Sequence, residues 1–125
     1  EITEEIKKTN DAIAALTGKA PVLFRPPGGY LSNEMVAVTE ELKVKIAYWS
    51  YEQDTKDWKG TSAQRIAEHV IKHISPGQII IFHDGCNTGR EMAKALDLIL
   101  TDLQGKGYRF ISMSELMELD KSNKE

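Results

Sequence analysis

Four short apolar runs, separated by longer amphipathic stretches, constrain the fold of this chain more than any other feature of its sequence. The runs cover residues 22–24, 46–50, 79–82 and 109–112, and they carry Ile, Val and aromatic residues without a regular polar–apolar alternation. Such runs are typical of strands that are covered on both faces. They begin roughly 25–35 residues apart, which leaves room for a helix in each connection and favours parallel βα units.

The stretches around these runs carry apolar residues at the spacing of amphipathic helices. Ser32 is placed to cap the second helix, Thr61 or Ser62 to cap the third, and residues 112–115 (Ser-Met-Ser-Glu) are typical of a capping box before a short fifth helix. We therefore predict one α/β domain over residues 1–125, with about four parallel strands and helices between them. The apolar faces of the first four helices consist of Ile2, Ile6, Ile13 and Leu16, then Met35, Val38 and Leu42, then Ile66, Val70 and Ile74, then Met92, Leu96, Ile99 and Leu103.

Composition argues against several classes of protein. The formal charge of −3 and the pI of about 5.7 disfavour a general nucleic-acid binder, which is usually basic. No apolar run approaches the ~20 residues that cross a bilayer, and no signal peptide opens the chain, so any targeting segment of a secreted parent lies elsewhere. Cys86 is the single cysteine, which excludes an internal disulfide and gives no basis for a cysteine-based zinc site; we assign it no role.

Unusual polar residues follow three of the predicted strands. Arg25 comes after the first, Asp54 and Asp57 with Trp58 lie in the loop after the second, and His83 follows the third. The carboxyl ends of parallel strands meet at one edge of a sheet, where loops from several strands build binding sites. We therefore expect these loops to form one site.

Residues 25–29 (Arg-Pro-Pro-Gly-Gly) combine a rigid and a free backbone. The prolines hold Arg25 in an extended conformation, so that its guanidinium is aimed, and the glycines allow a close approach of the backbone to a ligand. The N–H of Gly28 could then donate to an oxyanion. A rigid turn with a surface arginine would produce the same pattern.

Asp57 and His83 have a functional and an ordinary interpretation. A carboxylate beside the imidazole would raise the pKa of His83 and make it a proton donor near neutral pH, with Trp58 as the wall of a sugar-binding groove. The ordinary interpretation is a turn aspartate and a hydrogen-bonded core histidine. His69 and His73 have the i, i+4 spacing of a metal pair, but they flank an apolar helix face without an evident acidic third ligand, so we assign them no metal.

With these residues in view, the chain resembles the polysaccharide deacetylase family, the NodB-homology domain of carbohydrate esterase family 4. Three of the family's five ordered motifs occur in order. Residues 25–29 resemble the third motif, with Gly28 at its aromatic position and Tyr30 nearby; residues 54–58 (Asp-Thr-Lys-Asp-Trp) match the fourth, and residues 81–83 (Ile-Phe-His) match the fifth. The resemblance implies a distorted (β/α) barrel, here a partial one.

The first two motifs of the family are absent from these 125 residues. In the family they supply the catalytic base and the aspartate and histidines that ligate a divalent metal such as zinc. The resemblance therefore implies the C-terminal part of a deacetylase domain, with no metal ligands in this chain and no activity in isolation. It also implies that the chain is stable only with the missing N-terminal half or through self-association, because an open sheet edge leaves backbone groups unpaired.

The resemblance implies a role for each site residue. His83 would protonate the departing amine, Asp57 would hold His83, and Arg25 would orient the absent base. For substrate binding, it implies that Gly28 donates to the oxyanion, Ile81 shapes the pocket for the acetyl methyl group, and Trp58 lines the groove; Tyr30 is assigned to the same groove.

The expected function is metal-dependent hydrolysis of N-acetyl groups of a glycan, with peptidoglycan N-acetylglucosamine ahead of chitin and xylan, in the cell envelope or outside the cell. A carbohydrate-binding or regulatory domain without catalysis is the alternative, in which Trp58, Tyr30 and Trp49 would matter more than His83. A flavodoxin-like binding domain ranks last, because no Gly-rich phosphate loop follows the first strand.

Overall fold

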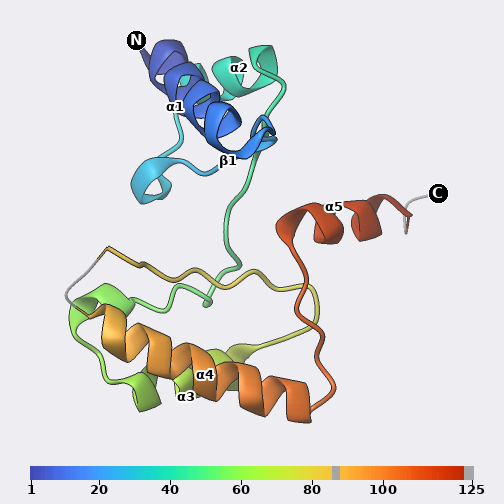
Figure 1. Ribbon diagram of the computed structural model, residues 1–125. Helices are drawn as coiled ribbons and strands as arrows, with labels where there is room; N and C mark the ends of the chain where they lie inside the picture. Colours follow the sequence, from blue (N-terminus) through green and yellow to red (C-terminus); the bar gives the residue numbers. More distant parts are fainter. Residues whose placement is uncertain (86–87, 123–125) are drawn as a thin grey trace. The chain divides into compact units, whose positions relative to one another are not determined.

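The computed structural model describes residues 1–85 and 88–122, so Cys86 lies outside the described part. The chain forms two compact units, Glu1–Tyr48 and Trp49–Glu125, and each is described by itself (Figure 1). Among the described residues, no helix is long and apolar enough to span a membrane.

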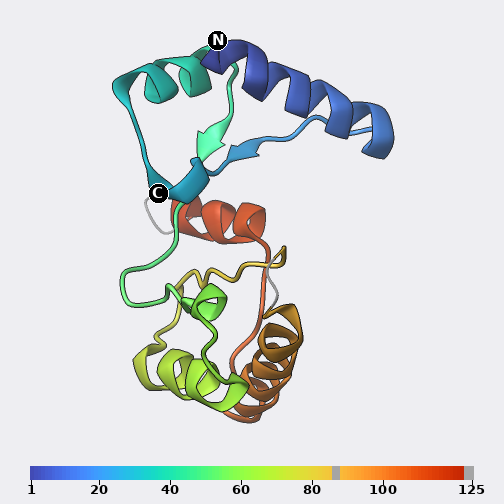
Figure 2. The same ribbon diagram turned by 90° about the vertical axis from the view of Figure 1, so that its left-hand side faces the viewer.

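The first unit contains two helices and a small parallel sheet. Helices α1 (Ile2–Thr17) and α2 (Asn33–Glu41) accompany strands β1 (Leu23–Phe24) and β2 (Lys45–Ile46). The strands pair in parallel, with Leu23 opposite Lys45 and Phe24 opposite Ile46, and they lie side by side in Figure 2. This sheet brings the loop after β1 next to the segment that follows β2.

Local signals set the helix ends of the first unit. Gly18 adopts a left-handed conformation with φ of 72°, and its N–H donates to the Ala14 carbonyl to close α1. At the start of α2, the Ser32 hydroxyl accepts a hydrogen bond from the Met35 N–H at 3.1 Å, as the sequence predicts.

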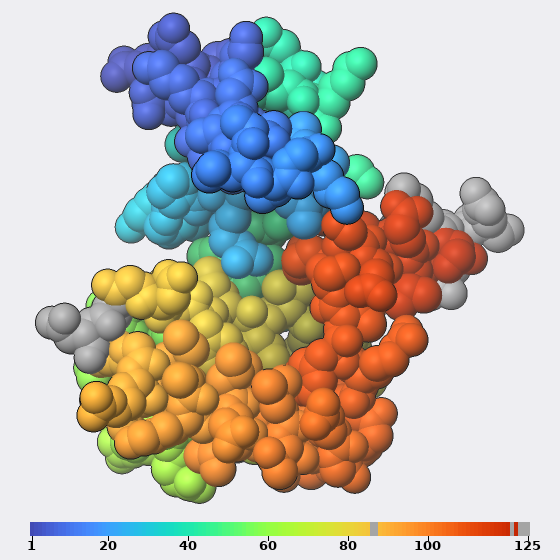
Figure 3. Space-filling model, in the orientation of Figure 1, coloured from blue at the N-terminus to red at the C-terminus, as the bar shows by residue number. Residues whose placement is uncertain are grey.

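The second unit is built on two helices, α3 (Ala63–His73) and α4 (Gly89–Gly105), which lie side by side (Figure 1). α4 forms one outer face of this unit in the space-filling view (Figure 3). Phe82, at the end of the third apolar run, packs against both core clusters of the unit. The residues of these clusters are Ala67, Val70, Ile99 and Leu103 in one, and Ala63, Ile66 and Ala95 in the other.

The last helix, α5 (Met113–Ser122), begins with the predicted capping box. The Glu115 carboxylate accepts from the Ser112 N–H at 2.8 Å, and the Ser112 hydroxyl accepts from the Glu115 N–H at 3.2 Å. At α3, by contrast, the Ser62 side chain forms no capping bond, and the first N–H of the helix, from Ala63, donates instead to Glu91 of α4 at 3.0 Å.

The strands are shorter than predicted. In the described residues, the second run retains only Ile46 in a strand, and the third is reduced to a parallel bridge between Asp54 and Ile81. A tight turn interrupts this ladder: the Gln53 N–H bonds back to the Ser50 carbonyl, and Glu52 has a φ of 69°.

The expected strand at residues 109–112 is not found in the described structure. This segment has no ladder partner there, and Phe110 is 42% exposed rather than buried. A strand requires a neighbouring backbone to pair with, and an apolar run alone does not supply one. In the described residues, the expected four or so strands are therefore reduced to a two-stranded sheet and one bridge.

Candidate active site

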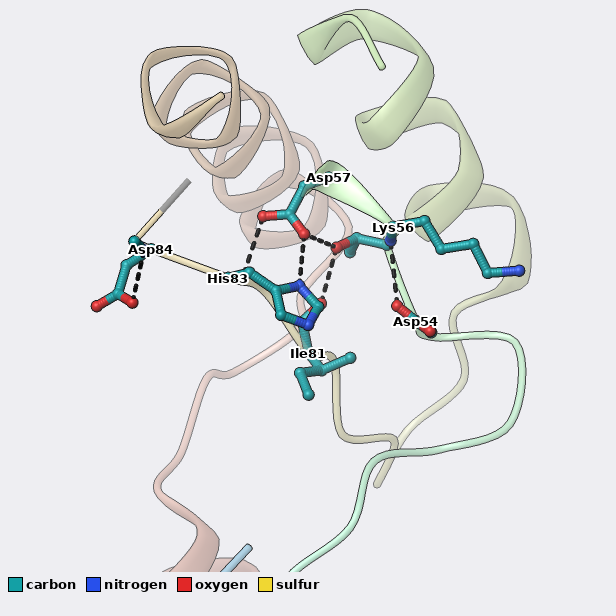
Figure 4. Close-up of polar contacts among 8 residues, drawn as sticks. Asp54, Lys56, Asp57, Ile81, His83 and Asp84 are labelled. Atoms are coloured by element: carbon teal, nitrogen blue, oxygen red, sulfur yellow. Dashed lines mark hydrogen bonds and ion pairs between the residues drawn. The ribbon is translucent and has the colours of Figure 1, made fainter. Parts of the chain in front are cut away.

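The second unit contains a close pair formed by Asp57 and His83. Asp57 contacts His83 through both carboxylate oxygens: Oδ1 lies 2.7 Å from the imidazole Nδ1, and Oδ2 accepts from the His83 backbone N–H at 2.9 Å (Figure 4). The Asp57 side chain is fully buried, whereas the His83 side chain is 37% exposed. Two bonds to one residue fix the position of the imidazole, and part of the ring stays accessible to solvent.

The backbone around Asp57 is shaped by the preceding loop. Asp57 starts the short 3-10 helix η2 (Asp57–Lys59), and Lys56 before it has a left-handed φ of 48°. The Asp54 carboxylate accepts from the Lys56 N–H at 3.1 Å, which stabilises this turn. Asp54 also pairs with Ile81, so the loop is fixed beside the segment that carries His83.

The pKa of Asp57 lies below the ordinary aspartate value of 3.8. Burial is the largest single influence and raises the pKa, but the hydrogen bonds from the His83 backbone and ring, the Thr55 hydroxyl and the charge of His83 together outweigh it. Asp57 is therefore ionised at neutral pH, and the Nδ1 that faces it carries the proton.

Two buried polar residues of this loop were not singled out from the sequence. The Thr55 hydroxyl lies 3.1 Å from Asp57 Oδ1 and 2.8 Å from the Ile81 carbonyl. The Gln53 side chain is completely buried and donates to Gln78 Oε1 at 2.9 Å. A polar residue directly beside a motif carboxylate is the signal that would have pointed to Thr55.

Two predicted substrate-binding residues adjoin the pair. Ile81 is 8% exposed and lies in the same cluster of side chains as Asp57 and His83 (Figure 4). Trp58 follows Asp57 directly and is 49% exposed, with the Lys59 ammonium 5.0 Å from its ring. An exposed indole beside a fixed histidine can stack on a sugar ring.

The other predicted site residues belong to the first unit. The Arg25 Nε donates to the Ala47 carbonyl at 3.1 Å and Nη2 to the Tyr48 carbonyl at 3.4 Å, so the segment after β2 aims the guanidinium. Gly28 has a φ of 62°, and no described residue accepts a hydrogen bond from its N–H. Tyr30 is 80% exposed.

The residues that the structure describes do not fit a metal ion. Within residues 1–85 and 88–122, no group of three or more His, Cys, Asp or Glu is arranged to hold one. His69 and His73 each have a backbone partner: His69 Nε2 lies 2.6 Å from the Glu52 carbonyl, and His73 Nδ1 lies 2.8 Å from the His69 carbonyl.

Comparisons with known proteins agree with the motifs. The family described as "Polysaccharide deacetylase" matches residues 1–47. A peptidoglycan-N-acetylglucosamine deacetylase of Bacillus cereus is 39% identical over 99 residues, which are 79% of this chain and 46% of that protein. The chain thus spans less than half the length of this curated relative.

Solved structures give the same result over almost the whole chain. The structure of the peptidoglycan deacetylase PdaC from Bacillus subtilis has a TM-score of 0.82 and 30% identity, covering 98% of this chain and 56% of that one. A structure described as a CE4 family pseudoenzyme from Bacillus anthracis has a TM-score of 0.81 and 30% identity, covering 93% of this chain and 39% of that one. These similarities confirm the predicted fold class.

Proposed function

This chain belongs to the polysaccharide deacetylase family, carbohydrate esterase family 4, and we propose that it supplies the acid side of an active site that hydrolyses N-acetyl groups of a glycan. The reaction class is hydrolysis of a non-peptide carbon–nitrogen bond. The proposed glycan is peptidoglycan N-acetylglucosamine, with chitin and xylan as the other candidates, and the proposed location is the cell envelope or the exterior. The contact between Asp57 and His83 is the observation that carries this proposal.

The geometry of the pair suits a proton donor. Asp57 holds Nδ1–H of His83, so the proton available to a ligand is the second one of the imidazolium form, on Nε2, for which no described residue is a hydrogen-bond partner. When the amide carbon–nitrogen bond of the substrate breaks, the departing nitrogen takes this proton and leaves as an amine. Asp57 remains ionised and holds the imidazole in place throughout.

The first unit offers a backbone N–H and a guanidinium rather than a proton donor. The N–H of Gly28, for which no described residue is an acceptor, is proposed to donate to an oxyanion that forms on the acetyl carbonyl. Arg25 offers a permanent charge that would hold an aspartate ionised. Tyr30, Trp58 and Ile81 are proposed to contact the glycan and the acetyl methyl group.

A divalent metal, zinc or a similar ion, would polarise the acetyl carbonyl in the complete enzyme. No cluster within residues 1–85 and 88–122 fits such an ion, and its ligands and the base that deprotonates water are proposed to come from another part of the protein. A longer chain that includes the N-terminal half of the domain, or a partner copy, could provide them. We expect the isolated chain to release no acetate.

The test is acetate release from N-acetylated peptidoglycan by the native full-length protein that contains this chain. His83→Ala should lower the rate by about 10²–10⁴-fold, because the amine would leave without its proton. Asp84→Ala, at the exposed neighbouring residue, is the matched control and should retain the wild-type rate. An unchanged rate in His83→Ala would show that His83 is not the acid.

A carbohydrate-binding domain without catalysis is the second candidate. The exposure of the aromatic side chains of Trp58 and Tyr30 favours it. In that case the wild-type protein would release no acetate, Trp58→Ala would lose glycan binding, and His83→Ala would keep it.

A further inference from the structure

The Thr55 hydroxyl lies between two acceptors that belong to the candidate active site. It is 2.8 Å from the carbonyl oxygen of Ile81 and 3.1 Å from Oδ1 of Asp57. Thr55 is only 6% exposed, so water does not compete freely for this hydroxyl. The oxygen of Asp57 that it faces is the same one that accepts the Nδ1–H of His83.

A hydroxyl group has one proton, so Thr55 can donate fully to only one of these acceptors at a time. When the proton points to Asp57, it neutralises part of the charge on Oδ1 and weakens the attraction of that oxygen for the Nδ1–H of His83. When the proton points to Ile81, the full charge of Oδ1 faces the imidazole. The two positions of the hydroxyl therefore have opposite effects on the hydrogen bond between Asp57 and His83.

The backbone next to Thr55 adds a second constraint. Thr55 follows Asp54, which pairs with Ile81, and its hydroxyl reaches the same residue from the adjacent position. The loop and the segment that carries His83 are thus joined at two successive residues. Among the described residues, His83 is the titratable group in direct contact with Asp57, so Thr55 has no competing charge at this carboxylate.

We propose that Thr55 is a positioning residue that sets the strength and direction of the hydrogen bond between Asp57 and His83. Its catalytic consequence rests on the proposed function, but the contact itself does not. Thr55 does not touch the reacting atoms; it acts through Asp57.

The test compares Thr55→Val, which removes the hydroxyl and keeps the shape of the side chain, with Thr55→Ser, which keeps the hydroxyl. Carboxyl-carbon NMR of the folded protein follows the titration of Asp57, and the downfield proton resonance of His83 Nδ1–H reports the hydrogen bond. Thr55→Val should make Asp57 bind protons about two- to tenfold more tightly, since one hydrogen bond to the carboxylate is lost. It should also shift the Nδ1–H resonance, and Thr55→Ser should restore both values.

Thr61→Val is the matched control, because it removes a threonine hydroxyl from the same unit without a described contact to the pair. A folded Thr55→Val protein with the wild-type Asp57 titration and Nδ1–H resonance would overturn the inference. If Thr55→Val does not fold, the wild-type protein decides: the Thr55 hydroxyl proton resonance should move as Asp57 titrates, and a resonance that stays constant would overturn the inference.

Acetate release by the native full-length protein separates this inference from the proposed function. If the function is right, Thr55→Val should lower the rate and Thr55→Ser should recover it. If no variant and no wild-type sample releases acetate while the NMR changes occur as described, the positioning role of Thr55 stands and the proposed function fails.

Discussion

The two units of this chain hold their functional residues in different ways. In the second unit, the Asp57 carboxylate accepts two hydrogen bonds from His83, one from its backbone N–H and one from its ring. In the first unit, Arg25 is aimed by two backbone carbonyls and has no described carboxylate partner, and the Gly28 N–H has no described acceptor.

Asp57 and His83 thus already have hydrogen-bond partners within the unit, whereas Arg25 and the Gly28 N–H keep donors that a ligand could use. A carboxylate that is buried with its donors can keep its geometry without substrate. A cation and an N–H that face outward are useful only when an anion or an oxyanion reaches them. We expect mutations at the pair to change the stability of the second unit, and mutations at the first loop to change mainly binding.

The largest effect on stability should come from Asp57→Ala. The substitution leaves the His83 N–H and the Thr55 hydroxyl without their charged acceptor, and we expect a loss of about 2–4 kcal/mol in the free energy of unfolding. Urea unfolding of the native full-length protein, followed by fluorescence or circular dichroism, measures it. Asp84→Ala should change stability by less than about 0.5 kcal/mol. Equal effects of the two substitutions would contradict a structural role for the pair.

The free energy of unfolding should fall as the pH is lowered. The pKa of Asp57 is lowered in the folded chain, so its contribution is complete above the unfolded value of 3.8 and is lost as the pH falls through the folded pKa. Glu91 and Glu115 also have lowered pKa values and add to the acid loss. Stability against pH in Asp57→Asn, compared with the wild type, isolates Asp57: the slope below about pH 4 should be shallower in the variant. Identical slopes would mean that Asp57 is not held by these hydrogen bonds.

A smaller loss of stability than that of Asp57→Ala should come from Gly28→Ala in the first unit. A left-handed φ costs an alanine about 1–2 kcal/mol, and the new Cβ would lie 2.9 Å from the Tyr30 ring, which is exposed and can move away. Gly18→Ala, with a similar φ of 72° and no atom within 4 Å, is the matched control for stability. The two variants should unfold alike, and Gly28→Ala alone should change glycan affinity because it displaces Tyr30. A much larger loss of stability in Gly28→Ala would show that the loop is structural.

Local patterns predicted the helices well. The spacing of Ile66 and Val70 indicates the buried face of α3, and Ser32 and the capping box at residues 112–115 begin their helices as predicted. These signals act within one or two turns of the chain, so the sequence contains them in full. The contact between Asp57 and His83 could be expected only because both residues stand in motifs that follow strands.

The extent of the sheet and the role of Thr55 could not be predicted in the same way. The run at residues 109–112 has strand composition, but its pairing depends on a neighbour that the run itself does not specify. The Thr55 hydroxyl contacts the carbonyl of Ile81, which lies 26 residues further along the chain. This contact depends on the course of the chain between them, including the turn at Glu52 and the packing of Phe82 against the core. Such contacts arise from the assembled unit rather than from any short stretch.

The most direct test of the account is a double-mutant cycle on acetate release by the native full-length protein, with His83→Ala, Asp57→Asn and the combined variant. If Asp57 acts through His83, the combined variant should be no slower than His83→Ala alone, because the carboxylate has nothing left to hold. Rates that fall by the product of the two single effects would contradict the account and show that Asp57 and His83 act independently.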